Sequence, residues 1–334
     1  MQLNLRRLGG IGIAVALTCS AAFMTTGDES VAKAESAKAR HENTTRFWTN
    51  ARVRKAIPRD FVYNQKSHRF ERKGPGGSTT IGGASWTAGG EVLKTTGKVL
   101  FAMGGSYWVC SASVVDDAVA DRSIILTAGH CAYDEVALAF ATNWMFVPEY
   151  DTAPTSFDSG GQFCATTVHG CWTASSLVVH NGYASAGGFN NTAIVHDFAF
   201  AVVGAGGKSG TAQLDTTVGG HPIQFSSVAA NADTYLFGYP ASGAYKGKDL
   251  VYCRGKLGFD SRVSNLTYKV GCNMTGGASG GPWFSPFAGG SGTIMSLNSY
   301  GYGGVSAMYG PKLNSKTQTM FGVAGTAVAN TIVS

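Results

Sequence analysis

A histidine and a serine, each set among small residues, are the first candidates for chemistry in this sequence. Residues 126–131 read Leu-Thr-Ala-Gly-His-Cys and residues 276–282 read Gly-Gly-Ala-Ser-Gly-Gly-Pro. Imidazole is the usual general base near neutral pH, so His130 is a candidate base. Ser279 is the matching candidate nucleophile, because flanking glycines let backbone amides approach a reacting carbonyl and stabilise an oxyanion. The predicted donors are the amides of Gly277 and Ser279. Taken alone, each pattern also fits an ordinary buried histidine or a glycine-rich turn.

A third candidate is the carboxylate of Asp197, which begins the apolar stretch Asp-Phe-Ala-Phe-Ala-Val at residues 197–202. Such a carboxylate can fix the tautomer of a histidine base and stabilise its protonated form. Its neighbour His196 is a poor second base, because adjacent strand residues point to opposite faces. An aspartate at the start of a strand is usually a turn residue, and three others are rivals by position: Asp158, Asp215 and Asp233.

The order of these residues separates two kinds of acyl-transfer site. Gly-Ala-Ser-Gly-Gly at residues 277–281 also fits the Gly-x-Ser-x-Gly turn of α/β-hydrolases. That fold places its acid and its histidine after the serine. Residues 280–334 contain no Asp, Glu or His, which excludes this class. The candidate residues instead occur in the order histidine, aspartate, serine along the chain.

The elements that must position these residues are predicted to be strands. The 46 glycines are about twice the usual share of roughly 7%. Short apolar runs rich in β-branched and aromatic residues recur between turn signals, at 98–103, 107–115, 123–128, 198–203, 234–237, 266–272 and 292–297. A stretch rich in Gly, Ser and Thr at 204–220 reads as a linker, so two barrels or sandwiches are expected. Residues 322–333 fit either a terminal helix or a last strand.

The N-terminal residues differ from the rest of the chain. Arg6 and Arg7 followed by an apolar run to Met24 predict an export signal. Residues 25–75 hold 12 Lys/Arg and 6 Asp/Glu, whereas residues from Gly76 on hold 12 and 14. This charged segment predicts a propeptide or an ordered arm, with a disordered linker as the alternative. The basic charge lies outside the main domain and gives no support for a nucleic-acid partner.

The cysteines also indicate export. Removing the signal removes Cys19 and leaves six cysteines, an even number that predicts three disulfides. Six cysteines permit 15 pairings, and proximity along the chain favours Cys110–Cys131, Cys164–Cys171 and Cys253–Cys272. The spacings do not match a zinc site.

Together, these three motifs resemble the trypsin/chymotrypsin-like serine peptidases over roughly residues 90–330. The stretch Cys-Asn-Met-Thr-Gly-Gly at 272–277 is closer to the bacterial glutamyl-endopeptidase-like (V8-like) branch. The resemblance implies an all-β fold of two six-stranded antiparallel barrels with the site in the cleft between them. It places His130 and Asp197 on the first barrel and Ser279 on the second.

The departures from this family concern activation and specificity. Ala278 stands where trypsin-like zymogens carry an aspartate, and Thr80 precedes Ile-Gly-Gly at 81–83, so the usual ion-pair activation is not expected. Arg72-Lys73 is one candidate processing site. Asn273 occupies the position of the trypsin pocket aspartate, and the expected pocket wall lacks the histidine of glutamyl endopeptidases. The predicted substrate-binding residues are Asn273, Asn298, Ser299, Tyr300 and Gly301.

The sequence thus predicts five regions: a signal peptide at 1–24, a propeptide or arm at 25–80, a first barrel at 81–205, a linker at 206–220 and a second barrel at 221–334. The expected function is that of a secreted, monomeric serine endopeptidase that needs no cofactor or metal and binds neither nucleic acid nor membrane. The alternative is a catalytically silent binding or adhesive module on the same fold.

Overall fold

The computed structural model describes residues 26–73, 83–152 and 162–334, with side chains from Ala37 on. Among the described residues, those from Thr26 to Ser36 belong to one unit and those from Ala37 on to another. The predicted signal peptide lies outside the described residues, and so does Asp158. No helix among the described residues has the length and apolar character needed to cross a membrane.

The first barrel is a closed ring of six antiparallel strands. Its strands are β5 (Thr96–Met103), β6 (Ser106–Val115), β7 (Ser123–Thr127), β10 (Thr142–Pro148), β11 (Trp172–His180) and β12 (Ala199–Val203). The ring follows the order β6-β5-β10-β11-β12-β7, and a β6–β7 pairing closes it. All residues of β7 and β12 are buried, in keeping with their β-branched and aromatic composition. These two strands lead to and from the candidate site.

The second barrel consists of two sheets that share one core. One contains β13 (Asp233–Gly238), β14 (Val251–Lys256), β17 (Pro282–Ala288) and β18 (Ser291–Leu297). The other contains β15 (Gly258–Phe259), β16 (Thr267–Gly271), β19 (Tyr300–Tyr302) and β20 (Ala307–Pro311). Leu236, Trp283 and Val270 are buried in the core between them. The all-β, two-barrel prediction is confirmed, although backbone pairing between the described strands closes only the first ring.

Short helices and turns connect these strands. They are α3 (Glu91–Thr95), α4 (Asn181–Ala184), α5 (Asn191–Val195), α6 (Leu214–Val218), the small hairpin β8 (Tyr133–Asp134) and β9 (Ala139–Phe140), and the 3₁₀ turns at Gly129–Cys131, Tyr150–Thr152, Phe163–Thr166 and Ser261–Val263. The predicted linker 206–220 therefore contains a helix, α6. The stretch 322–333 contains both predicted alternatives, the end of helix α7 (Ser315–Thr326) and strand β21 (Thr331–Val333).

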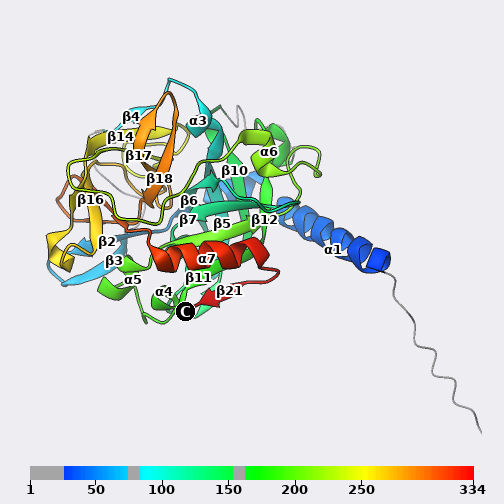
Figure 1. Ribbon diagram of the computed structural model, residues 1–334, viewed down its shortest axis with the longest axis horizontal. Coiled ribbons are helices and arrows are strands. Elements are labelled where there is room, and N and C mark those ends of the chain that lie inside the picture. The colour runs from blue at the N-terminus through cyan, green and yellow to red at the C-terminus, as the bar shows by residue number, and fades with distance from the viewer. Residues whose placement is uncertain (1–25, 74–82, 153–161) are drawn as a thin grey trace, which may run out of the picture. The chain divides into compact units, whose positions relative to one another are not determined.

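Two strands pair outside the barrel in which the predicted boundaries place them. Strand β4 (Ala84–Ser85) lies within the predicted first barrel, 81–205, and pairs with β14 of the second. Strand β21 pairs in parallel with β11 of the first barrel, although it follows the second in sequence. Figure 1 shows β21 beside β11 and α7. Free strand edges recruit partners from any part of the chain, which sequence order does not reveal.

All three predicted disulfides are present: Cys110–Cys131, Cys164–Cys171 and Cys253–Cys272. The first joins β6 to the turn that carries His130, and the third joins β14 to the residue after β16.

The charged N-terminal segment is ordered from Ala37 to Lys73. Helix α1 (Thr26–Phe47) is followed by α2 (Asn50–Lys55), β1 (Ile57–Pro58), β2 (Asp60–Asn64) and β3 (Arg69–Lys73). Strand β1 pairs in parallel with β6 of the first barrel, and β2 pairs in parallel with β19 of the second. The disordered-linker alternative is therefore wrong for these residues. The segment crosses from one barrel to the other.

Candidate active site

His130 lies in the 3₁₀ turn directly after β7 and is fully buried. The disulfide from Cys131 to Cys110 ties this turn to the neighbouring strand. A side chain at Gly129 would meet the ring of Tyr183 and the carboxylate of Asp197. The glycine before the histidine therefore leaves room for the close approach of these two partners.

The carboxylate of Asp197 holds His130 through two contacts. Its Oδ1 accepts the backbone N–H of His130 at 2.8 Å, and its Oδ2 lies 2.8 Å from Nδ1 of the imidazole. Ser299 donates its hydroxyl to the same Oδ2 at 2.5 Å. Asp197 is fully buried, and hydrogen bonds of this kind are what make a buried carboxylate tolerable. The arrangement fixes the imidazole with Nε2 directed away from Asp197.

The rival residues lie elsewhere. Asp233 forms surface ion pairs with Lys256 and Arg254, and Asp215 bonds to its own helix turn. His196 stacks on His180, with ring centroids 4.5 Å apart. Among the three described candidates, Asp197 is the carboxylate that contacts the imidazole of His130.

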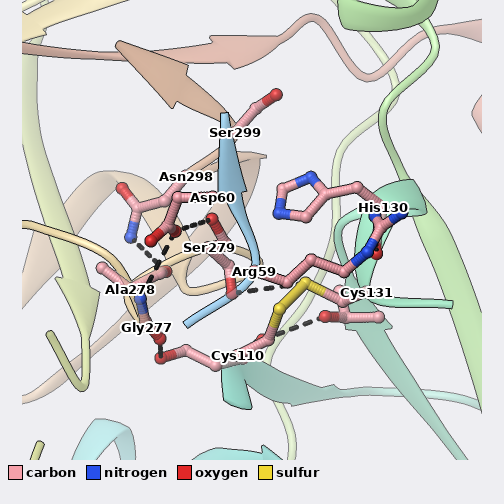
Figure 2. The surroundings of a disulfide bond; sticks show 12 residues. Arg59, Asp60, Cys110, His130, Cys131, Gly277, Ala278, Ser279, Asn298 and Ser299 are labelled. Carbon is pink, nitrogen blue, oxygen red and sulfur yellow. Dashed lines mark hydrogen bonds between the residues drawn. A yellow bond between two sulfur atoms is a disulfide. The ribbon is translucent and has the colours of Figure 1, made fainter. Parts of the chain in front are cut away.

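Ser279 lies in a turn between β16 and β17 that rests on the His130 region. Its carbonyl accepts the N–H of Ser111 at 2.7 Å. Gly280 has a φ of +83°, and a Cβ there would meet Ser111, Thr127 and the backbone of Ala128. Only glycine satisfies both the left-handed conformation and this close approach. Figure 2 shows Ser279 and His130 near the Cys110–Cys131 disulfide.

The hydroxyl of Ser279 is bonded to an unexpected partner, Asp60 of β2. Ser279 Oγ donates to Oδ1 of Asp60 at 2.9 Å, and the backbone N–H of Gly277 donates to the same oxygen at 3.3 Å (Figure 2). Within the described chain, the buried Nε2 of His130 has no hydrogen-bond partner. The sequence reasoning missed Asp60, which is one of six acidic residues in a charged segment and carries no motif.

A cavity of about 320 Å³ opens beside Ser279. Four of the five predicted substrate-binding residues line it: Asn273, Ser299, Tyr300 and Gly301. Asn298 does not. It is fully buried, and its side-chain amide donates to the carbonyls of Phe237 and Ala278. Its role is to hold the Ser279 turn, which corrects the prediction that it contacts substrate.

Strand β19 forms one wall of the cavity and is held in place by hydrogen bonds to Asp260. Tyr300 and Tyr302 donate their hydroxyls to Oδ2 of this buried carboxylate, at 2.8 and 2.7 Å. Burial raises the pKa of both phenols, so they stay protonated and act as donors. The strand that borders the cavity is therefore fixed by its own side chains.

Among the described residues, the one group with metal-ligand spacing is Cys110, His130 and Cys131. Both cysteines belong to a disulfide, and a disulfide offers no thiolate to a metal ion.

Neither a scan of protein-family models nor a search of curated proteins finds a match for this chain. Solved structures do match. The protease Anisep from Arthrobacter nicotinovorans is 34% identical, with a TM-score of 0.59, over 75% of this chain and 99% of its own. The thermostable serine protease AL20 from an extremophilic microorganism is 36% identical, also with a TM-score of 0.59, over 71% and 99% of the two chains. A Glu endopeptidase at 18% identity and a TM-score of 0.54, covering 74% and 98%, shares the fold.

These likenesses and the two-barrel fold define a protease of the chymotrypsin type. The chain belongs to the chymotrypsin-like serine proteases.

Proposed function

We propose that this protein is a secreted serine endopeptidase whose catalytic triad is Ser279, His130 and Asp197. The observation that carries the proposal is the paired contact of Asp197 with the backbone and the imidazole of His130, directly beside the Ser279 turn. With Nδ1–H held by Asp197, Nε2 is left as the proton acceptor. Export is supported by the N-terminal sequence and by three disulfides.

In this mechanism, Ser279 Oγ attacks the scissile carbonyl while its proton passes to Nε2 of His130. The C–O bond forms as the carbonyl oxygen becomes an oxyanion. The C–N bond then breaks, and His130 returns the proton to the leaving amine. Water attacks the acyl-enzyme by the same route and releases Ser279 and a carboxylic acid product.

The amides of Gly277 and Ser279 are the proposed oxyanion donors. The Gly277 amide already donates to a carboxyl oxygen of Asp60, which also accepts the hydroxyl of Ser279. A transition-state oxyanion needs a donor at this place, where one such donor is worth about 10²–10³ in turnover.

The cavity beside Ser279 supports a preference for uncharged side chains before the scissile bond. Apart from Asp60, which belongs to the N-terminal segment, no charged residue is found among the described residues that line it. Its wall includes Met274, Val305, Ala307 and Met308. Burying an unpaired charge there would be costly, whereas apolar side chains gain from burial. The V8-like resemblance makes glutamyl specificity the competing outcome, and a silent binding module is the competing function.

The test compares the processed protein with its Ser279→Ala variant on a complex peptide library, with cleaved bonds read by mass spectrometry. We expect cleavage by the wild type alone, mainly after uncharged residues. Cleavage mainly after glutamate would replace the specificity proposal and keep the triad. Equal behaviour of the two proteins would refute the triad and support the binding module.

A further inference from the structure

We propose that residues 48–73 form an inhibitory segment that binds the substrate cleft of its own chain, with the carboxylate of Asp60 blocking the nucleophile. This inference rests on the proposed function, because it takes Ser279 as the nucleophile. It goes further by assigning the occupant of the cleft, the contacts that hold it and the reason that it is not a substrate.

The block is the contact of Asp60 with Ser279. Oδ1 of Asp60 receives both the Ser279 hydroxyl and the Gly277 amide, so it stands where a reacting carbonyl oxygen would be stabilised. The hydroxyl of Ser279 therefore donates its hydrogen bond to Asp60 and not to Nε2 of His130. A side chain at Gly276 would clash with the carboxylate of Asp60, so the turn is shaped to admit it. While this contact persists, the hydroxyl is not activated.

Arg59, the residue before Asp60, anchors the segment in an acidic pocket. Its side chain is only 1% exposed, and its guanidinium lies 3.7 Å from Asp134 and 3.6 Å from Glu135. It also donates a hydrogen bond of 2.6 Å to the carbonyl of His130. A charge buried this deeply requires such partners. The anchor joins the inhibitory segment directly to the loop that carries the catalytic base.

Aromatic contacts continue the interface on both sides. Phe61 stacks on Phe189 with centroids 4.0 Å apart and meets the imidazole of His130 edge-on at 5.6 Å. Trp48 is fully buried and donates its indole N–H to the carbonyl of Asn143. Buried aromatic anchors beside a charged pair are typical of specific interfaces. The segment is therefore bound along its length.

The main chain of the segment occupies the edge where a peptide substrate would bind. Phe61, Val62 and Tyr63 pair in parallel with Tyr300, Gly301 and Tyr302 of β19, the strand that borders the cavity. Adding a strand to a free edge is a common mode of peptide recognition. At Ser279, however, the group of the segment that accepts the hydroxyl is the carboxylate of Asp60. A carboxylate is a poor electrophile, so the segment can remain bound without being cut at this point.

The test measures how fast Ser279 reacts with diisopropyl fluorophosphate in the full-length chain. Intact-mass spectrometry reads labelling of intact and processed chains separately in one sample, diluted until the cut segment no longer occupies the cleft. We expect intact wild-type chains to react at least about 10²-fold more slowly than processed ones. Asp60→Ala is expected to speed labelling of the intact chain by about 10–100-fold, the usual value of a hydrogen bond to a charged group. Asp60→Asn, which keeps the size of the side chain, is expected to give a smaller increase.

Glu71→Gln is the matched control, because Glu71 is an exposed carboxylate of the same segment that bonds only locally, to Asn64 and Ser67. It is expected to label at the wild-type rate. Equal labelling of intact and processed wild-type chains, or wild-type rates in both Asp60 variants, would overturn the inhibitory segment and leave the protease assignment intact. A processed chain that reacts no faster than Ser279→Ala would instead overturn the proposed nucleophile, and the inhibitory segment with it.

Discussion

The hydroxyl of Ser299 donates a hydrogen bond to Oδ2 of Asp197, the same oxygen that faces Nδ1 of His130. Ser299 precedes β19 in the second barrel, whereas Asp197 precedes β12 in the first. The carboxylate of the proposed triad is therefore held from both barrels. The same short stretch that lines the substrate cavity also supports the acid of the proposed triad.

Replacing Ser299 by Ala should lower kcat of the processed enzyme by about 10-fold, with little change in KM. The reason is that the buried carboxylate of Asp197 would lose one of its hydrogen-bond donors. A hydrogen bond to a charged group is worth about 1.5–3 kcal/mol. The contact with the imidazole remains and retains part of this stabilisation. Asp197→Asn should be far more severe, about 10⁴-fold, because the amide favours the wrong imidazole tautomer. Steady-state kinetics on one peptide substrate measures both. Equal losses in the two variants would contradict the supporting role of Ser299.

Removing the disulfide beside His130, by the double change Cys110→Ser and Cys131→Ser, should lower the free energy of unfolding by about 3 kcal/mol. The bridge spans 21 residues, and long loops gain the most from closure. The matched control is the pair Cys164→Ser and Cys171→Ser, which spans 7 residues. It should cost about 1 kcal/mol less and should leave kcat nearer to the wild-type value. Chemical denaturation and kinetics test the two effects, and a larger loss in the control would refute the argument.

Lys98 should make the free energy of unfolding depend on pH above about pH 7. Burial, with a smaller effect from Lys248, lowers the pKa of Lys98 to about 7, and its ammonium donates to the carbonyl of Gly247. Between pH 7 and the ordinary lysine pKa, the unfolded chain holds a proton that the folded chain has lost, so stability rises with pH. The expected gain is about 1.4 kcal/mol per pH unit in that window. Denaturation of wild type and Lys98→Met at pH 6, 7, 8 and 9 measures it. Parallel curves for the two proteins would show that Lys98 does not titrate this way.

Changing Asn273 to Asp should shift cleavage toward basic residues before the scissile bond. Asn273 lines the cavity, and its side-chain oxygen accepts the hydroxyl of Tyr245 and the amide of Gly83. An aspartate keeps these acceptor contacts and adds a negative charge, so kcat/KM for Lys and Arg peptides should rise by about 10-fold or more relative to Leu peptides. Fluorogenic peptides that differ only in this residue provide the measurement. An unchanged ratio would mean that the side chain before the scissile bond does not reach Asn273.

The features that could be predicted from the sequence are those formed by residues close together in the chain. Three features are of this kind: the stretch around His130, the turn at Ser279 and the three cysteine pairs. Their small side chains and short loops leave few alternative conformations or pairings. The named apolar runs likewise predicted strands β5, β6, β7, β12, β13, β16 and β18, whereas β10, β11, β14, β17 and β20 lie outside them. Asn298 was misplaced because it lies in the bend between β18 and β19, where only the path of the chain decides whether a side chain faces the cavity or the Ser279 turn.

The contact of Asp60 with Ser279 lay beyond such reasoning because it joins residues 219 positions apart. The N-terminal segment has no apolar periodicity, and its charge alone fits a disordered linker equally well. The segment matches three features of the surface that it covers: the acidic pocket of Arg59, the edge of β19 and the glycine at position 276. None of these features is visible until both barrels are assembled.

Because residues 48–73 belong to the same chain as the cleft they fill, they act there as a tethered ligand. A short tether gives such a ligand an effective concentration in the millimolar range, independent of how dilute the protein is. Once the chain is cut after Lys73, the same contacts become a reaction between two molecules. Occupancy of the cleft then falls with dilution. A protein cut once would thus remain inhibited at high concentration and become active on dilution.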